Sequence, residues 1–302
     1  STDVLGRSLA SSSVVGTGAN DKLTSINLTS LAIEAEPWQN VVFRLGGNYR
    51  TLESASPTFS LDYNTPTGVA SEIKQYETNV SVSYFPGRKM TGFGVERRIA
   101  NDYFARLFAQ VTRGDKNILN SDFDYTKVQL SYTQPWQMGG FGRLFTTIEA
   151  GKTFGEVPLG LLSVIPGNQT YFSIYNTFSQ LDFYEFVSDT YASFHFEHNF
   201  NGRLFSRIPF LRKLNLREII SVRGVIGNIS DENLALSNVP SNPNNLKLVA
   251  PSNEPYYEYS LGIGNIFKVF RIDFNFRGNY KDKVIYPDAR KFGVTGSFGF
   301  YF

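Results

Sequence analysis

The chain has 302 residues, a formal net charge of +2 at pH 7 and no cysteine, which excludes a disulfide-stapled secreted domain and a thiolate metal site. Its mean hydropathy is -0.21, and no run approaches the roughly 18 apolar residues of a membrane-spanning helix. The balanced charge also excludes a nucleic-acid footprint. The 27 Phe, 17 Tyr and 26 Gly residues are instead typical of barrels whose aromatic residues border lipid.

Apolar and polar residues alternate along most of the chain, which is the period of a β-strand with two different faces. Val80 and Val82, for example, fall on one face of such a segment, while Ser81 falls on the other. About twelve segments carry the pattern, most of them close to the roughly 9 to 11 residues of a tilted membrane strand. In chain order they are Asp3 to Gly16, Ser25 to Glu36, Val41 to Arg50, Gln75 to Tyr84, Tyr103 to Val111, Val128 to Tyr132, Leu144 to Ala150, Ala192 to Glu197, Leu216 to Ile226, Tyr257 to Gly264, Phe270 to Arg277 and Arg290 to Phe302.

This pattern predicts an all-β fold, a transmembrane antiparallel up-and-down β-barrel that forms a single domain over residues 1–302. One face of each strand would meet lipid and the other would meet the lumen. Membrane strands close into barrels because an open sheet edge leaves backbone groups unpaired in hydrocarbon. We therefore expect a protein of the outer membrane of a Gram-negative bacterium, in contact with outer-membrane lipid and lipopolysaccharide.

The final segment ends on alternating aromatic residues. Phe298, Phe300 and Phe302 share one face of the predicted strand. This ending resembles the C-terminal strand signal by which the outer-membrane insertion machinery recognises its clients. The resemblance implies that these three phenylalanines act as an insertion signal.

The connections alternate between short and long, as in outer-membrane barrels with short inner turns and long outer loops. The short ones are Glu36 to Gln39, Gln134 to Phe141 and Gly264 to Phe267; the long ones are Ser54 to Ser71, Gly151 to Phe186, Asn228 to Pro255 and Asn279 to Arg290. Two inner connections, Pro86 to Asp102 and Asn201 to Asn215, are longer than the short inner turns expected of such barrels. The second interleaves leucines with basic residues, which fits either a short interfacial helix or a basic turn at the lipid headgroups.

The connection from Gly151 to Phe186 is expected to fold into or over the lumen. It spans about 35 residues, and irregular connections of that length in compact domains are usually functional or packed. It is also too aromatic for a freely solvated loop. The residues expected to form this plug are Pro166, Gly167, Asn168, Tyr171, Phe172 and Tyr175.

The lumen face of the predicted strands carries more basic than acidic residues. The basic residues are Arg44, Arg50, Arg106, Lys127, Arg143, Arg217, Arg223, Arg271 and Arg277, and the acidic ones are Glu77, Glu149, Glu197 and Asp273. This excess fits a lumen that favours anionic solutes or an acidic plug. It equally fits a lattice of ion pairs between strands that stiffens a narrow barrel.

Two histidines are the only imidazoles that could carry acid–base chemistry. Ser193, His195 and Glu197 share the lumen face of one segment, so a His–carboxylate pair could activate the hydroxyl. No spacing typical of a catalytic site supports this catalytic interpretation. We therefore expect that the protein is not an enzyme and binds no cofactor. A metal site is also not expected, because His195 and His198 point to opposite faces of a strand.

Several runs in the second half of the chain resemble one known family. They are Ala150-Gly151-Lys152, Gly155-Glu156-Val157-Pro158, Pro166 to Phe172, Glu185 to Asp189, His198 to Gly202 and Ile208 to Leu214. The runs resemble the C-terminal barrel of a Bacteroidota family of unknown function whose members carry a carboxypeptidase-regulatory-like domain at the N-terminus. The resemblance covers Phe123 to Phe302 well and the first third loosely.

That barrel is in turn similar to the superfamily of outer-membrane insertases and two-partner-secretion transporters, which has about sixteen strands and a reentrant sixth outer loop. The resemblance implies that Gly151 to Phe186 is this sixth loop and that four strands precede Ser1. The Arg-Gly-aromatic loop motif of the superfamily is absent, and Pro166-Gly167-Asn168 stands in its place.

These observations predict a transport or assembly conduit with a lumen-plugging loop. The alternative is a structural barrel that anchors the other protein subunits of an envelope complex, and an outer-membrane hydrolase is third. A passive porin is disfavoured, because about twelve strands filled with arginine leave little aqueous space.

Overall fold

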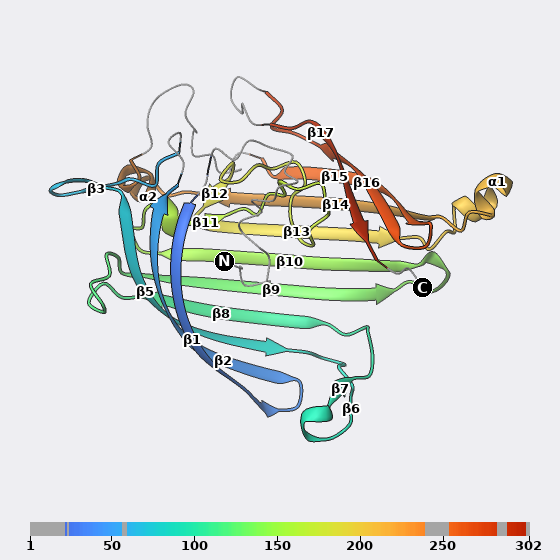
Figure 1. Cartoon of the computed structure of the whole chain (residues 1–302), viewed down its shortest axis with the longest axis horizontal. Helices are drawn as coiled ribbons and strands as arrows, with labels where there is room; N and C mark the ends of the chain where they lie inside the picture. The colour runs from blue at the N-terminus through green and yellow to red at the C-terminus, as the bar shows by residue number, and fades with distance from the viewer. Residues whose placement is uncertain (1–21, 23, 56–58, 239–253, 283–288, 300–302) are drawn as a thin grey trace.

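The computed structural model describes residues 22, 24–55, 59–238, 254–282 and 289–299. Its main element is an antiparallel sheet of 11 strands, each paired with the next main-sheet strand along the chain, and Figure 1 shows this sheet curled into a trough. The strands are β1 (Thr24–Trp38), β2 (Val41–Ser54), β5 (Glu72–Tyr84), β8 (Arg106–Gly114), β9 (Tyr125–Gln137), β10 (Arg143–Phe154), β13 (Thr190–Asn199), β14 (Arg217–Asn228), β15 (Tyr256–Ile266), β16 (Phe270–Arg277) and β17 (Phe292–Phe298).

Eleven of the twelve predicted strands are therefore present, in the expected up-and-down order. The remaining one, Asp3 to Gly16, lies outside the described residues, as do Phe300 and Phe302. Within the described part of the chain, β1 and β17 are the two edges of the sheet and each pairs with a single neighbour. The fold class predicted from the period-two pattern is confirmed.

The two faces of the sheet differ as the alternation requires. In β5, Gln75, Glu77 and Asn79 are buried on the concave face, whereas Val80 is 48% exposed on the convex face. The convex face is apolar along its length, and its exposed residues include Leu45, Val111, Leu130, Ile148, Ile220, Leu261, Ile272 and Val294. A face of this kind is stable where it meets lipid rather than water.

The short connections meet at one end of the sheet, which we call the turn end (Figure 1). The connection from β5 to β8 contains a small hairpin of β6 (Met90–Thr91) and β7 (Arg98–Ile99). The connection from β13 to β14 contains a 3-10 turn, Phe205–Arg207, followed by the four-residue helix α1 (Pro209–Arg212). The helical alternative for this connection is therefore the one that forms, although it lasts a single turn.

The opposite end, the loop end, is more ordered than the sequence predicts. The connection after β2 forms a hairpin of β3 (Tyr63–Thr65) and β4 (Gly68–Ala70). Asn228 to Pro255, one of the long connections, contains the helix α2 (Asp231–Leu236). The buried Asn233 amide explains this order, because its oxygen accepts the Val157 N–H at 2.8 Å. In the described part of the chain no helix has the length and apolarity to cross a membrane.

Candidate functional site

The long connection between β10 and β13 lies on the concave side of the sheet, and we call residues 155–189 the inserted segment. It begins later than expected, since Gly151 to Phe154 continue β10. Near its two ends β11 (Ser163–Val164) pairs with β12 (Val187–Ser188). The pairing closes the segment at its base, so the residues between these strands form a compact lobe.

Two clusters of buried apolar residues hold the segment. The first joins Val157, Leu159 and Leu161 to residues at the loop end of the sheet and its hairpin, namely Leu52, Leu61, Ile73 and Tyr125. The second joins Ile165, Phe178, Leu181 and Phe186 to Tyr191, Val225 and Tyr256 of the strands. The segment is therefore packed as a second layer on the concave face.

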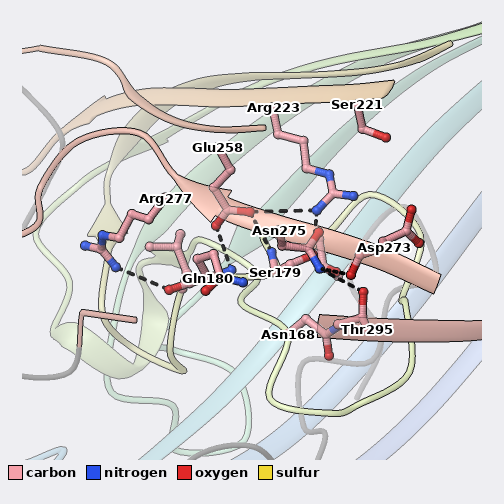
Figure 2. A network of polar contacts seen from close by, with 12 residues as sticks. Asn168, Ser179, Gln180, Ser221, Arg223, Glu258, Asp273, Asn275, Arg277 and Thr295 are labelled. Carbon is pink, nitrogen blue, oxygen red and sulfur yellow. Dashed lines mark hydrogen bonds and ion pairs between the residues drawn. The ribbon is translucent and has the colours of Figure 1, made fainter. Parts of the chain in front are cut away.

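A buried carboxylate on β15 binds the backbone of the segment. Figure 2 shows Glu258 facing Ser179 and Gln180, whose backbone N–H groups donate to its two oxygens at 2.8 Å each. Arg223 on β14 donates to the Ser179 hydroxyl at 2.6 Å and lies 3.7 Å from Glu258. Tyr256 donates to the same carboxylate at 2.6 Å. The contacts of Glu258 with Ser179, Gln180 and Arg223 join β15 to the inserted segment and to β14, whereas the contact with Tyr256 lies within β15.

A buried arginine on β16 makes the second polar attachment. Arg277 donates to Glu185 of the segment at 2.6 Å and to the carbonyl of Gln180 at 3.2 Å. Its guanidinium also lies 5.0 Å from the ring centre of Tyr256. Because Arg277 is 1% exposed, its charge depends on Glu185 for neutralisation.

The tip of the segment meets the edge of the sheet at β17. Gly296 donates its N–H to the carbonyl of Tyr171 at 2.7 Å, and its carbonyl accepts the Ser173 N–H at 2.8 Å. Both groups of one residue in an antiparallel strand point to the same side, so they point away from β16. The Ser173 hydroxyl further donates to Asp273 at 3.1 Å and contacts the Thr295 hydroxyl at 2.9 Å. The segment thus occupies the free edge of β17 at this residue.

The six residues predicted to form a plug fall into two groups. Pro166, Gly167 and Asn168 lie inside the lobe, where a Cβ on Gly167 would stand 2.4 Å from the carbonyl oxygen of Leu181. Asn168 is 1% exposed and accepts the Thr170 N–H at 2.9 Å. The aromatic members are instead on the surface of the lobe: Tyr171, Phe172 and Tyr175 are 53%, 44% and 60% exposed. The interior of the lobe is built from other aromatic residues, Phe178 and Phe186.

Some of the predicted lumen charges pair within the wall. Arg50 donates to Glu77 at 2.6 Å, and the Tyr125 hydroxyl donates to the same carboxylate. Glu149 accepts the Tyr191 hydroxyl at 2.5 Å. These contacts correspond to the alternative in which the charges stiffen the wall.

Three further predicted lumen residues pair with one another in the other half of the wall. Arg271 donates to both oxygens of Glu197 at 2.8 and 2.7 Å and to Asp273 at 2.9 and 2.8 Å. The bidentate geometry is the strong form of an arginine–carboxylate contact.

The other basic residues have different surroundings. Lys127 donates to the Leu161 carbonyl at 2.9 Å and is a third attachment of the inserted segment. Arg106 and Arg143 lie 5.2 and 5.5 Å from the ring centres of Phe108 and Tyr103. Arg44 is exposed near the turn end, and Arg217 is half-buried at the start of β14. The nine basic residues therefore do not converge on one site.

Two carboxylates that matter most for the inserted segment were not among the predicted acidic partners. Glu258 has the same strand parity as Ser260, so the alternation that identified the other lumen residues would have found it. Glu185 lies in the segment itself, where no period exists. Counting both reduces the basic excess of the lumen.

Tyr184 packs tightly against the connection that follows β2. Its side chain is 6% exposed and its ring lies 4.7 Å from that of Phe59. Burial raises the pKa of Tyr184 to about 12, because the phenolate would lose its hydration.

The two histidines lie in different surroundings. His195 is 7% exposed, with its ring 4.8 Å from that of Phe178. His198 lies at the turn end, where its Nε2 is 2.8 Å from the carbonyl of Phe141. Among the described residues, no group of three or more His, Cys, Asp or Glu side chains is placed to hold a metal ion.

Comparison with solved structures supports the fold. BamA from Haemophilus ducreyi, in a crystal structure lacking POTRA domains 1-3, matches with a TM-score of 0.53 at 12% identity. The match covers 91% of this chain and 55% of that one, so the chain spans about half the length of BamA as solved. OprD from Pseudomonas aeruginosa matches with a TM-score of 0.34 at 10% identity, over 88% of this chain and 66% of that one, which is too weak to argue from. At this identity the likeness to BamA shows the fold alone.

Sequence comparison identifies the family. No curated protein matches the chain. The model of the C-terminal domain of a family of unknown function, DUF5686, matches residues 65–231, a range that starts earlier and ends earlier than the resemblance in the sequence suggested. The matched residues run from the β3–β4 hairpin through the inserted segment to α2, and they make up more than half of the chain. The chain therefore belongs to the DUF5686 family, of which it carries the C-terminal domain.

Proposed function

We propose that this chain forms the barrel of a transport or assembly conduit in the outer membrane of a Gram-negative bacterium, with the inserted segment as the plug of its lumen. The observation that carries the proposal is the attachment of the segment through buried charged groups of the wall, Glu258 and Arg277. A segment that only covered the loop end would not need such groups. Each would be costly to bury without its partner in the segment.

Space remains beside the plug, which favours a conduit over a solid scaffold. A cavity of about 460 Å³ lies between the apolar side of the segment, at Leu161 and Ile165, and the polar wall at Arg50, Lys127 and Gln129. A modest displacement of the segment would enlarge this cavity along the wall. Tyr171 and Tyr175 are exposed on the surface of the lobe, so a cargo could contact them.

The second candidate is a structural barrel that anchors a larger envelope complex. The dense pairing of Arg271 with Glu197 and Asp273 favours it, because a stiff wall suits an anchor as well as a conduit. In either case the partners are outer-membrane lipid, lipopolysaccharide and other proteins of the envelope. An enzymatic role is not part of the proposal, since His195 is buried against Phe178 and away from the lipid-facing surface.

The test is single-channel conductance of the full-length protein in planar bilayers. A quiet wild type with large openings after deletion of Leu159 to Phe183 would support the plugged conduit. Glu258→Gln should give brief openings, because it weakens one attachment and leaves the segment in place. Silence in all three proteins would overturn the conduit and leave the anchoring barrel.

A further inference from the structure

The connection between β13 and β14 has a composition unlike the rest of the turn end. Residues 200–216, which we call the cationic connection, contain four basic residues and no acidic residue. Their apolar side chains are exposed rather than packed: Leu204, Ile208, Phe210 and Leu214 are 46%, 48%, 76% and 50% exposed. A segment that combines exposed apolar residues with unbalanced positive charge is stable at a boundary between anions and hydrocarbon.

The cationic connection is fixed to an aromatic rim at the turn end. Arg203 lies 4.2 Å from the ring centre of Phe141 and donates to the Gly140 carbonyl at 2.7 Å. Trp136, near the end of β9, and Phe267, in the turn between β15 and β16, are 44% and 87% exposed. Aromatic girdles of this kind mark the headgroup level of a membrane around a barrel. Figure 1 shows α1 projecting beyond the strand ends at this level.

The positive charge of the connection is not neutralised within the described part of the protein. Arg207, Arg212 and Lys213 are exposed, and none has an ion pair with another described residue. Glu218, the nearest carboxylate in the chain, accepts the backbone N–H of Leu204. The three exposed charges are therefore available to a ligand.

From this placement we propose that the cationic connection is a docking site for anionic phospholipid in the leaflet at the turn end. The three exposed basic side chains bind the phosphate groups, while Phe210 and Leu214 enter the acyl boundary. The ligand is an anionic lipid rather than a protein, because the connection is anchored at the aromatic rim and its charge has one sign. The site does not depend on the proposed plug, since it contains no residue of the inserted segment.

The absence of cysteine in these 302 residues allows a clean fluorescence test with this chain. A polarity-sensitive probe on Leu214→Cys would be measured in nanodiscs of phosphatidylcholine and of equimolar phosphatidylcholine and phosphatidylglycerol. The same probe on Thr67→Cys, in the exposed β3–β4 hairpin at the loop end, reports any general effect of the lipid. We expect a blue shift at Leu214→Cys that depends on phosphatidylglycerol, and no such shift at Thr67→Cys.

The charge requirement is tested with two matched triple variants. Each basic residue near an anionic surface contributes about fivefold to binding of the membrane. The first variant combines Arg207→Gln, Arg212→Gln and Lys213→Gln. It should bind the anionic lipid about 100-fold more weakly and abolish the blue shift. The second variant combines Arg113→Gln, Lys116→Gln and Lys152→Gln, which removes the same charge from the loop end. This variant should leave the blue shift intact. A probe that stays in water in both lipids would overturn the proposal. A shift that is equal in both lipids, or that survives the first triple variant, would overturn it as well.

Discussion

The inserted segment is attached to the barrel in two different ways along its length. Its first part, from Val157 to Leu162, packs through apolar contacts with Leu52, Ile73 and Tyr125. Its later part is held by Glu258 and Arg277 through hydrogen bonds of fixed geometry. Apolar contacts tolerate small shifts of the packed groups, whereas a buried charge fails when its partner is lost. Both parts supply burial, and the buried charges at the later part fix the position of the segment more sharply than apolar contacts do.

The largest effect is expected from removing one member of the buried ion pair. Arg277→Met leaves Glu185 buried without its cation, so the free energy of unfolding should fall by about 4 kcal/mol. Denaturant unfolding of the folded barrel in detergent micelles would measure the change. The double variant Arg277→Met with Glu185→Gln should recover most of the loss, because no charge is then left unpaired. Equal stabilities for the single variant and the wild type would show that Arg277 does not fix the segment.

A smaller effect is expected in the apolar part. Leu161 is 1% exposed, so Leu161→Ala should cost about 3 kcal/mol through the cavity it leaves. Hydrogen exchange should show faster exchange near Leu161 and unchanged protection at Ser179 and Gln180. The control is Leu119→Ala, at a side chain that is 60% exposed at the same end. It should change neither the free energy of unfolding nor the exchange near Leu161. Loss of protection in both parts of the segment would mean that the two attachments form one unit.

The buried side chain of Tyr184 predicts that the free energy of unfolding falls at alkaline pH. The pKa of this phenol is raised to about 12 in the folded protein, from an ordinary value of about 10. The contribution of the neutral phenol to the free energy of unfolding is fully present below pH 10. As the pH rises toward 12, about 2 kcal/mol of it is lost. Tyr184→Phe cannot ionise, so the difference in unfolding free energy between the two proteins should change over this range. A constant difference between pH 8 and 12 would contradict the burial of this side chain.

The smallest effect is expected at the edge of the sheet. Ser173→Ala removes the hydroxyl contacts with Asp273 and Thr295 but keeps the backbone bonds to Gly296, so the cost should be about 1 kcal/mol. Hydrogen exchange at the Gly296 amide would report the loosening of the tip. Thr67→Ala, in an exposed hairpin, serves as the comparison and should have no effect on that amide. A Gly296 amide with unchanged protection would show that the backbone bonds alone hold the tip.

The strands were predictable because their signal is local. Val80 and Ser81 take opposite faces whatever the rest of the chain does, since successive side chains of a strand alternate. The inserted segment has no such period, so its length and aromatic content predicted packing but not which aromatic residues pack. Tyr171 and Tyr175 were expected to belong to the plug and are exposed on its surface, while Phe178 and Phe186, which were not among the predicted plug residues, form its interior.

The charged residues of the candidate site were predictable only where they lie on strands, because only strands carry the alternating pattern. Glu77 and Asp273 could be placed on the lumen face from alternation, and Glu258 could have been placed in the same way. The segment residues that bind Glu258 and Arg277 could not be predicted, because strand parity does not say which irregular residue reaches the wall. The bond from Arg277 to Glu185 joins residues 92 positions apart and depends on how the segment folds back.

The contact between Ser173 and the β17 edge also sets an order of events during folding. Ser173 and Thr295 are 122 positions apart, and closing so long a loop is entropically costly until the intervening strands have paired. Contacts of such high sequence separation form late. The tip of the inserted segment therefore reaches its final bonds only after the last strand has joined the sheet, so a chain still being assembled keeps this tip free until β17 is in place.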